Sequence, residues 1–218
     1  MNKDFPILAI ETTSDLCSVA IQFDEKNYIE LNYLQKHIHS EKLMNMISYL
    51  CSEAKIDAKD FSSVAVSIGP GSFTGLRIGL SAAKGIAFGA GLPLIPVPTF
   101  KAHALQIAAN LKDGEMFTLL SSASVEDFYF SKYQVHENSF KEISSLQLIE
   151  KSSLEKELAD DELIFGNAKI TNKKIITSFP TAKSIANWAY LFGKDLLTFD
   201  YDILEPNYIK QFVGKVKK

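Results

Sequence analysis

The sequence has no long apolar run. No stretch reaches the roughly 18 consecutive apolar residues that a membrane-spanning helix requires. The opening Met1-Asn2-Lys3-Asp4 leads straight into a predicted strand, which argues against a signal peptide. We therefore expect a cytoplasmic protein with no membrane partner.

Cysteine and excess basic charge are also scarce. The two cysteines, Cys17 and Cys51, stand alone without the spacing of a metal site, so we expect both inside the protein as reduced apolar side chains. The formal net charge of −3 argues against a general nucleic-acid-binding surface. The composition therefore favours neither a cysteine-based metal site nor a broad nucleic-acid binder.

The rest of the composition is typical of a soluble globular protein. Hydrophobic residues make up 46% and charged residues 22% of the 218 positions. This length fits one large domain or two small ones. The class of fold therefore has to come from the order of the predicted elements.

Apolar periodicity predicts an α/β chain in which one order of elements occurs twice, less cleanly the second time. The first set comprises strands at residues 5–10, 17–23, 28–34, 64–68 and 94–97 and helices at 40–55 and 74–89. The second comprises strands at 116–121, 127–133, 140–149, 163–165 and 175–179, with helices at 99–109, after Ser152 or Ser153, and from Thr181. Ser40, Thr99 and Thr181 are the predicted caps of three helices. We infer a structural repeat.

Residues 67–79 contain a glycine turn between a strand and a helix. Gly69 and Gly71 permit close backbone approach, Pro70 removes a donor, and Ser72 or Thr74 can cap the helix. This layout offers free N–H groups to an anion, but any tight strand-to-helix connection shares it. The loop matches neither the Walker A nor the dinucleotide fingerprint, so both interpretations stay open.

The helix after this turn carries small residues at spacings of three and four, which places them on one face. They include Gly75, Gly79, Ala82 and Ala83. A helical glycine costs up to about 1 kcal/mol relative to alanine, so the pattern indicates that something approaches this face closely. Either the chain's own sheet or a second helix would account for it.

Four segments resemble the TsaB family of bacterial tRNA threonylcarbamoyladenosine biosynthesis proteins. They are residues 7–13, 17–20, 39–43 and 69–79. The resemblance is dense over residues 5–103, thins after 110, and returns in Glu205-Pro206-Asn207-Tyr208-Ile209.

The resemblance implies a two-lobed fold of the actin and sugar-kinase type, with a mixed sheet and helices in each lobe. We expect a first lobe at residues 1–98 and a reduced second lobe at 99–218, with residues 205–218 packing back on the first. It also implies a non-catalytic subunit that scaffolds and activates the paralogue TsaD, together with the ATPase TsaE. These proteins form N6-threonylcarbamoyladenosine next to the anticodon of certain tRNAs.

The resemblance also implies that chemistry belongs to the partners. TsaD holds a metal with two histidines at H-x-x-x-H spacing; here His103 stands at the second position and Thr99 replaces the first. One imidazole without further ligands is a poor metal site. We therefore expect no catalytic residue, no metal ligand and no cofactor in this chain alone, with ATP and a metal ion used by the partner subunits.

Candidate phosphate or ligand contacts lie in the first hairpin turn and the glycine loop. They are Glu11, Thr12, Thr13, Gly69, Gly71, Ser72 and Arg77. Hydroxyl and N–H groups there could bind phosphates, but the second lobe offers only one glycine turn, Gly166-Asn167, to complete such a site. The sequence Ser122-Ala123-Ser124 stands where the family has Asp-Ala-Arg.

The expected partner surface lies on helices 40–55 and 74–89, facing the matching helices of TsaD. Its predicted residues are Leu43, Met46, Ile47 and Leu50, which we expect to contribute to both the core and the interface, and Gly75, Gly79, Ala82 and Ala83. Pairing of the same surface would give a homodimer when TsaD is absent, and tRNA would be reached through the complex. The alternatives are a free-standing metallopeptidase or small-molecule kinase of this fold, and a binding module that uses the glycine loop.

Overall fold

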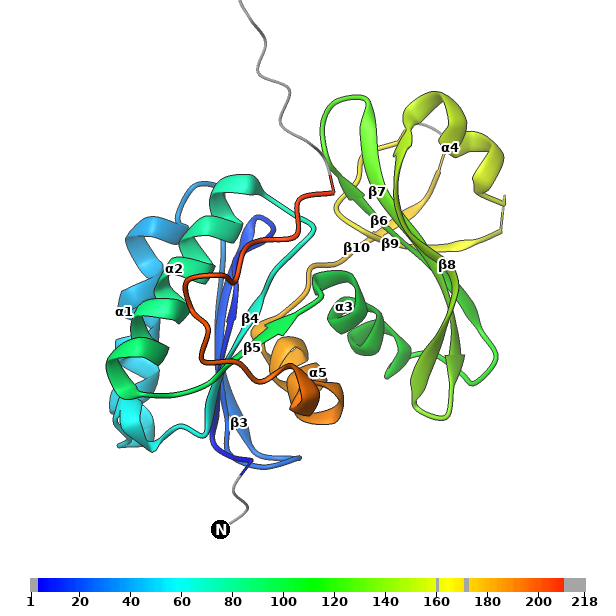
Figure 1. Ribbon diagram of the computed structural model, residues 1–218. Coiled ribbons are helices and arrows are strands. Elements are labelled where there is room, and N and C mark those ends of the chain that lie inside the picture. Colours follow the sequence, from blue (N-terminus) through cyan, green and yellow to red (C-terminus); the bar gives the residue numbers. More distant parts are fainter. Residues whose placement is uncertain (1–3, 160, 171–172, 210–218) are drawn as a thin grey trace, which may run out of the picture.

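The computed structural model describes residues 4–159, 161–170 and 173–209 and shows two sheets with helices between and around them (Figure 1). The first sheet has the order β3-β2-β1-β4-β5. Its strands are β1 (Ile7–Glu11), β2 (Leu16–Gln22), β3 (Tyr28–Leu34), β4 (Ser63–Ser67) and β5 (Leu94–Val97). The first three form an antiparallel meander, and β4 and β5 add in parallel. β1 and β4 are buried throughout, because helices cover both faces.

The second sheet repeats this topology with the order β10-β9-β6-β7-β8. Its strands are β6 (Met116–Ser122), β7 (Asp127–His136), β8 (Ser139–Glu150), β9 (Leu163–Gly166) and β10 (Ile175–Thr177). Again three antiparallel strands are followed by two parallel ones. The predicted structural repeat is confirmed, and so is the mixed sheet in each half.

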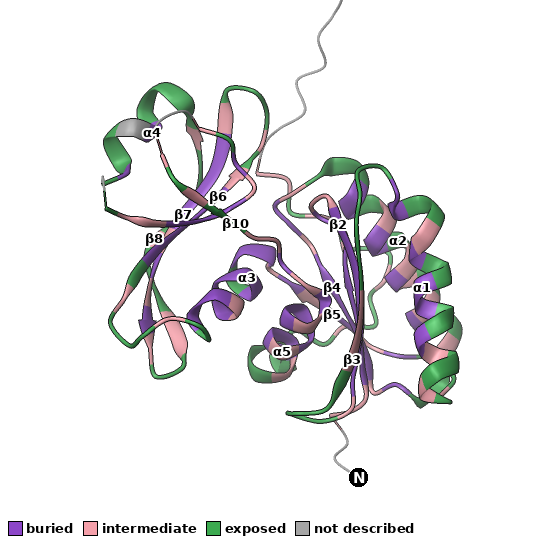
Figure 2. Ribbon diagram, turned by 180° about the vertical axis from the view of Figure 1, so that it is seen from behind, coloured by how far each residue is buried: buried purple, intermediate pink, exposed green. Residues whose placement is uncertain are grey.

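Helices α1 (His39–Ala54) and α2 (Phe73–Ala90) cover one face of the first sheet, and α5 (Ala182–Phe192) covers the other (Figure 2). The pleat of β1 divides the two cores, since Leu8 and Ile10 pack with α1 and α2 while Ile7 and Ala9 pack with α5. Helix α5 therefore completes the first lobe although it follows residue 98. The boundary between 98 and 99 itself stays a prediction.

Helix α3 (Thr99–Ala108) lies between the two sheets, beside α5 (Figure 1). Its Ala102 and Leu105 pack with α5 and the first sheet, whereas Phe100 and Ala104 pack against the second sheet. Helix α4 (Lys151–Glu157) covers the outer face of that sheet with Leu154, and short 3-10 helices lie at Ala58–Asp60 and Lys194–Leu196. No helix in the described part of the chain is both long and apolar enough to cross a membrane.

Two of the predicted caps are confirmed and others are wrong. The side chains of Ser72 and Thr181 accept the expected N–H groups of α2 and α5. Helix α1 starts after Ile38 and α3 after Pro98, each without a side-chain cap, so Ser40 and Thr99 lie inside the first turn.

The short fourth helix starts earlier than predicted, at Lys151 directly after Glu150, so neither Ser152 nor Ser153 caps it. The last strand of the second sheet ends at Thr177, two residues before the predicted end.

The closing segment returns to the first lobe. The Asn207 N–H donates to the Ile68 carbonyl at 2.7 Å, and the Tyr208 ring packs on Phe73 at 4.8 Å between centroids. The closing segment therefore contacts the first lobe at Asn207 and Tyr208. Of the predicted closing segment 205–218, residues 210–218 lie outside the described residues.

Candidate functional site

A cleft of about 830 Å³ opens between the two lobes, a size typical of small-molecule sites. The first lobe supplies the turn after β1 and the loop before α2, α3 supplies one wall, and the second lobe supplies the turn after β6. The lining includes Thr13, Ser14, Asp15, Lys36, Pro70, Gly71, Ser72, Thr99, His103, Ser122, Ser124, Asn167, Lys169, Ser178 and Tyr208. Thr13, Gly71 and Ser72, three of the predicted ligand contacts, therefore line one cleft.

The first hairpin turn is locked onto the start of α2. The Thr12 hydroxyl donates to the Gly75 carbonyl at 2.8 Å, and the Ser72 N–H donates to the Thr13 carbonyl at 2.7 Å. A Cβ atom at Gly75 would overlap the Thr12 carbonyl, and one at Gly79 would overlap the Thr12 hydroxyl. Gly75 and Gly79 therefore leave room for the chain's own first hairpin. At these two positions the close approach indicated by the sequence is a contact within the chain.

Gly71 also leaves room for the first hairpin turn, because a Cβ atom there would lie 2.5 Å from Thr13. Gly69 has φ +109, a conformation that favours glycine, and its N–H donates to the Thr99 hydroxyl at 3.0 Å. Thr99 thus fixes the glycine loop to α3 instead of capping the helix. These contacts hold the glycine loop at the cleft wall.

Glu11 lies beneath this turn and is fully buried. One carboxylate oxygen accepts the Thr13 N–H at 2.5 Å and the Thr13 hydroxyl at 2.6 Å, while the other has no hydrogen-bond partner among the described residues. Burial raises the pKa of Glu11 to about 7, against the lowering effect of the Thr13 and Ser67 hydroxyls. Glu11 and Thr12 do not line the cleft, so their part is to support Thr13.

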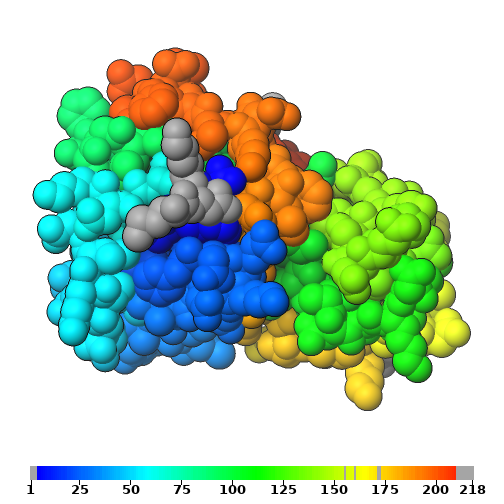
Figure 3. All heavy atoms as spheres, turned by 90° about the horizontal axis from the view of Figure 1, so that it is seen from below, coloured from blue at the N-terminus to red at the C-terminus, as the bar shows by residue number. Residues whose placement is uncertain are grey.

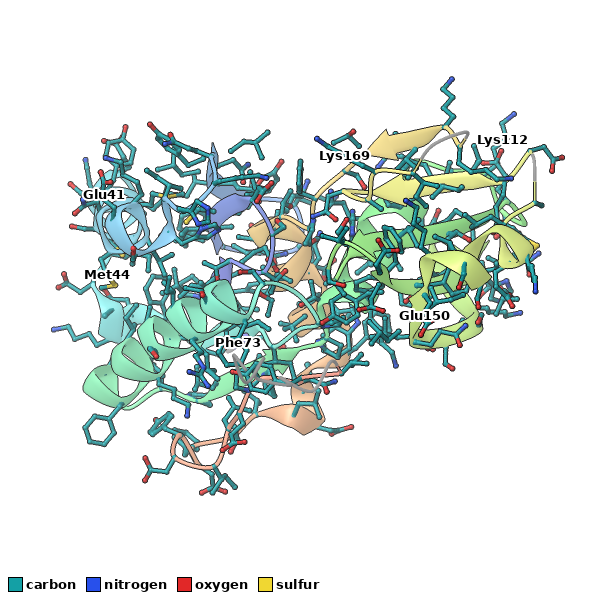
Figure 4. All side chains as sticks on the ribbon, turned by 90° about the horizontal axis from the view of Figure 1, so that it is seen from above. Glu41, Met44, Phe73, Lys112, Glu150 and Lys169 are labelled. Atoms are coloured by element: carbon teal, nitrogen blue, oxygen red, sulfur yellow. The ribbon has the colours of Figure 1, made fainter. Side chains whose placement is uncertain are left out.

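Arg77 is an exposed residue that contacts two residues of the cleft lining. Its Nε donates to the Tyr208 hydroxyl at 3.1 Å, and its guanidinium lies 4.0 Å from the centre of the Phe73 ring. Phe73, at the start of α2 (Figure 4), and Tyr208 both line the cleft. Arg77 therefore positions two aromatic side chains at the mouth.

His103 is a buried, neutral residue of the cleft wall. It is 3% exposed, and its Nε2 lies 2.9 Å from the Ser178 hydroxyl. Burial lowers its pKa to about 3, so the imidazole stays uncharged at neutral pH and is a weak base. No group of three or more metal-ligating side chains occurs among the described residues.

The second lobe brings to the cleft the Gly166-Asn167 turn and the Ser122-Ala123-Ser124 segment that the sequence singled out, whereas Lys36, Lys169 and Ser178 were not predicted. The Asn167 side chain accepts the Ser122 N–H at 3.2 Å and joins two turns of the cleft floor. Lys36, 3.9 Å from Asp15, and Lys169 add the positive charges of the lining. The arrangement suits a polar ligand. Its lysines and Ser178 carry no local sequence signal, because the fold alone brings them together.

The predicted partner residues do not form an open surface. Leu43, Met46, Ile47 and Leu50 are 2–6% exposed and belong to the core between α1, α2 and the first sheet. The small α2 residues of that prediction face the same way: Gly75, Gly79 and Ala83 are buried and Ala82 is half-buried. The α1 residues thus make the core contacts expected of them, because the apolar stripe of an amphipathic helix faces its own core first, whereas their contacts with a partner stay a prediction. A charged residue at Gly79 or Ala83 would disturb the fold, not only a partner.

The exposed faces of these helices carry different residues. Met44 and Tyr49 on α1 are 54% and 55% exposed, and Phe88 on α2 is 75% exposed. Met44 projects outward from α1 in Figure 4. A Cβ atom at Gly85 or Gly89 would meet nothing within 4 Å in the described chain. We call Met44, Tyr49, Gly85, Phe88 and Gly89 the outer helix face.

The comparisons with known proteins agree with this architecture. The chain is 34% identical over 131 residues to the tRNA threonylcarbamoyladenosine biosynthesis protein TsaB of Haemophilus influenzae, a match that covers 60% of this chain and 54% of the relative. It is 34% identical over 133 residues to the Escherichia coli protein of the same name, covering 61% and 56%. The matched part thus spans about half the length of these curated relatives.

Solved structures show the same fold at lower identity. A Pseudomonas aeruginosa protein described as similar to the peptidase YeaZ matches with a TM-score of 0.76 and 20% identity, over 94% of this chain and 99% of that one. Another structure, YeaZ from the same organism, matches with a TM-score of 0.75 and 20% identity, covering 93% and 99%. The predicted two-lobed α/β fold, with a mixed sheet and helices in each lobe, is confirmed.

The family assignment rests on both kinds of match. The named relatives confirm the resemblance to TsaB proteins that we found in residues 7–13, 17–20, 39–43 and 69–79. The family model of TsaD, described as tRNA N6-adenosine threonylcarbamoyltransferase, matches residues 33–191. The chain therefore belongs to the TsaD family.

Proposed function

We propose that this chain takes part in forming threonylcarbamoyladenosine in tRNA as a subunit without catalytic activity of its own, and that it acts by binding and activating TsaD. The observation that carries the proposal is the state of His103. This histidine is buried, neutral and bonded to Ser178, and Thr99 at the other position of the family's histidine pair is bonded to the Gly69 N–H. Both side chains therefore make hydrogen bonds within the cleft wall.

The outer helix face is the surface that we propose for TsaD. Gly85 and Gly89 each cost about 1 kcal/mol of helix stability relative to alanine, and no packing in the described chain explains them. They follow Ser81 at intervals of four residues, which aligns them along one strip of α2. Such a strip lets a second helix approach closely, and Met44, Tyr49 and Phe88 supply exposed apolar area on the same two helices.

The same surface would pair with itself when TsaD is absent. An isologous dimer needs one self-complementary patch related by a two-fold axis, and two adjacent helices with a strip of small residues provide such a patch. TsaD and a second copy would then compete for one surface. We also propose that TsaE and tRNA join through the complex, and that ATP and a metal ion are used by the partner subunits.

Charged substitutions on the outer helix face test the proposal. Phe88→Asp and Met44→Asp change exposed side chains, so the thermal unfolding midpoint should stay near that of the parent. Each should weaken binding to TsaD from the same organism by about 30-fold or more, the effect of losing an interface hot spot. Ile143→Asp, at a 50% exposed position on β8, is the matched control and should bind normally.

Two assays read the outcome. Light scattering after size-exclusion chromatography gives the mass of the free chain and of the mixture, and titration calorimetry gives the affinity. If Phe88→Asp and Met44→Asp bind TsaD as tightly as Ile143→Asp does, the proposed surface is wrong. The isolated chain should also show no steady ATP hydrolysis, in contrast to a free-standing kinase.

A further inference from the structure

A second groove, of about 490 Å³, lies away from the interlobe cleft, between α3, α5 and the first hairpin. Seen from below in Figure 3, the blue hairpin region, the orange α5 and the green second-lobe segments come together there. Its walls include Gln22, Glu25, Gln106, Asn138, Asn187 and Tyr190. No residue of this groove lines the cleft described above.

The groove contains a buried side chain that could form one more hydrogen bond. Gln22 is 3% exposed, and its side-chain nitrogen donates to the Asn187 side-chain oxygen at 3.0 Å. The Gln22 side-chain oxygen has no hydrogen-bond partner among the described residues. Exchanging the two ends of both carboxamides keeps the Gln22–Asn187 hydrogen bond and leaves the Gln22 nitrogen in that position instead. A buried polar atom without a partner costs about 1–3 kcal/mol. A ligand group that hydrogen-bonds to this atom would therefore bind favourably.

The surrounding walls are already fixed. The Gln106 side chain donates to the Phe179 carbonyl at 3.0 Å and accepts the Thr181 N–H at 3.1 Å, which ties α3 to the start of α5. The Tyr190 hydroxyl donates to Glu25 at 2.6 Å, and its ring packs on Phe5 with centroids 4.7 Å apart. The groove therefore exists without a ligand, and only the groups that cover the Gln22 side-chain oxygen would have to move for a ligand to reach it.

The chemistry of the lining selects the class of ligand. Carboxamides both donate and accept, as each hydroxyl of a polyol does. The Lys183 ammonium, the cation of this lining, lies over the Tyr28 ring at 4.1 Å, and Glu25 already bonds Tyr190. Leu105, Leu191 and the Tyr190 ring supply apolar area for C–H groups. We propose that this groove binds a small neutral polyol, of the size of a monosaccharide, through Gln22 and Asn187.

Titration calorimetry and saturation-transfer NMR on the full chain test the proposal, with D-glucose, D-ribose and myo-inositol as probes. At least one should bind with a Kd of about 1 mM or tighter, as expected for a ligand of about a dozen heavy atoms. Gln22→Leu, which has a similar volume, should weaken binding at least tenfold, and so should Asn187→Ala. Lys169→Ala in the interlobe cleft is the control and should leave binding unchanged.

Three results would overturn it. One is the absence of binding by all three probes to the folded parent chain. Another is equal binding by the parent, Gln22→Leu and Asn187→Ala, since the polyol would then occupy another site. Binding of citrate or spermidine that is lost in Gln22→Leu, without polyol binding, would show that the ligand is charged. None of these results depends on TsaD.

Discussion

Two buried titratable groups make the stability of this chain depend on pH in opposite directions. Burial raises the pKa of Glu11 to about 7 and lowers that of His103 to about 3. In an unfolded chain the same groups titrate near 4.5 and 6.5. Each therefore prefers its neutral form in the folded protein, and that preference appears in the free energy of unfolding.

For Glu11 the stabilising contribution is complete below pH 4.5, where the carboxyl is protonated in both states. As the pH rises from 4.5 to 7 the unfolded chain releases the proton while the folded chain keeps it, so the free energy of unfolding falls. The difference of 7 − 4.5 pKa units corresponds to about 3 kcal/mol. Above pH 7 this contribution stays lost.

For His103 the direction is reversed. Its contribution is complete above pH 6.5, where the imidazole is neutral in both states, and it is lost as the pH falls from 6.5 to 3. The difference of 6.5 − 3 pKa units corresponds to about 5 kcal/mol. Between pH 4.5 and 6.5 each group changes the stability by about 2 kcal/mol, and the two changes nearly cancel.

The test is urea denaturation at several pH values from 4.5 to 6.5, with Glu11→Gln, His103→Gln and the parent chain. Relative to the parent, Glu11→Gln should gain about 2 kcal/mol of unfolding free energy as the pH rises through this window, and His103→Gln should lose about 2 kcal/mol. Taking differences from the parent cancels all other titrating groups. Parallel curves for parent and variants would refute the assignment of neutral buried forms.

Two further predictions concern α2. Gly75→Ala should destabilise the chain by about 3 kcal/mol, because the added Cβ overlaps the Thr12 carbonyl. Gly85→Ala should stabilise the free chain by up to about 1 kcal/mol. Thermal and urea unfolding measure both variants, and an equal change in their free energies of unfolding would contradict the contact between Gly75 and the hairpin. Ser72→Ala removes the side chain that accepts the Gly75 N–H and should cost about 1 kcal/mol in the same assay, and a neutral result would mean that this cap does not stabilise α2.

The sequence predicted the local structure well where the signal is local. The helix caps Ser72 and Thr181 hydrogen-bond to backbone within three residues, so short-range chemistry suffices. Thr99 looked like a third cap, but its hydroxyl binds Gly69, 30 residues away. The Thr99 hydroxyl accepts a hydrogen bond from this distant backbone N–H and not from one in its own helix, and no local sequence pattern predicts such a contact.

The errors at the candidate site have the same origin. Helical periodicity correctly placed Leu43 and Leu50 on one apolar face, but periodicity does not say whether that face meets the chain's own sheet or a partner. The structure shows that it meets the sheet and that Met44 and Phe88 face outward. Likewise the Ser178 hydroxyl contacts His103, which lies 75 residues earlier in the sequence, because the chain returns past α3 before it enters α5. Topology assembles the cleft, so only part of it could be predicted.

The most direct test of the proposed function is reconstitution of tRNA modification from purified proteins. This chain alone should form no threonylcarbamoyladenosine. Added to TsaD and TsaE from the same organism, with ATP, a metal ion and the other substrates, it should raise the rate, while Phe88→Asp should not and Ile143→Asp should act as the parent does. Product formation or steady ATP turnover by this chain alone, abolished by His103→Gln, would contradict the account.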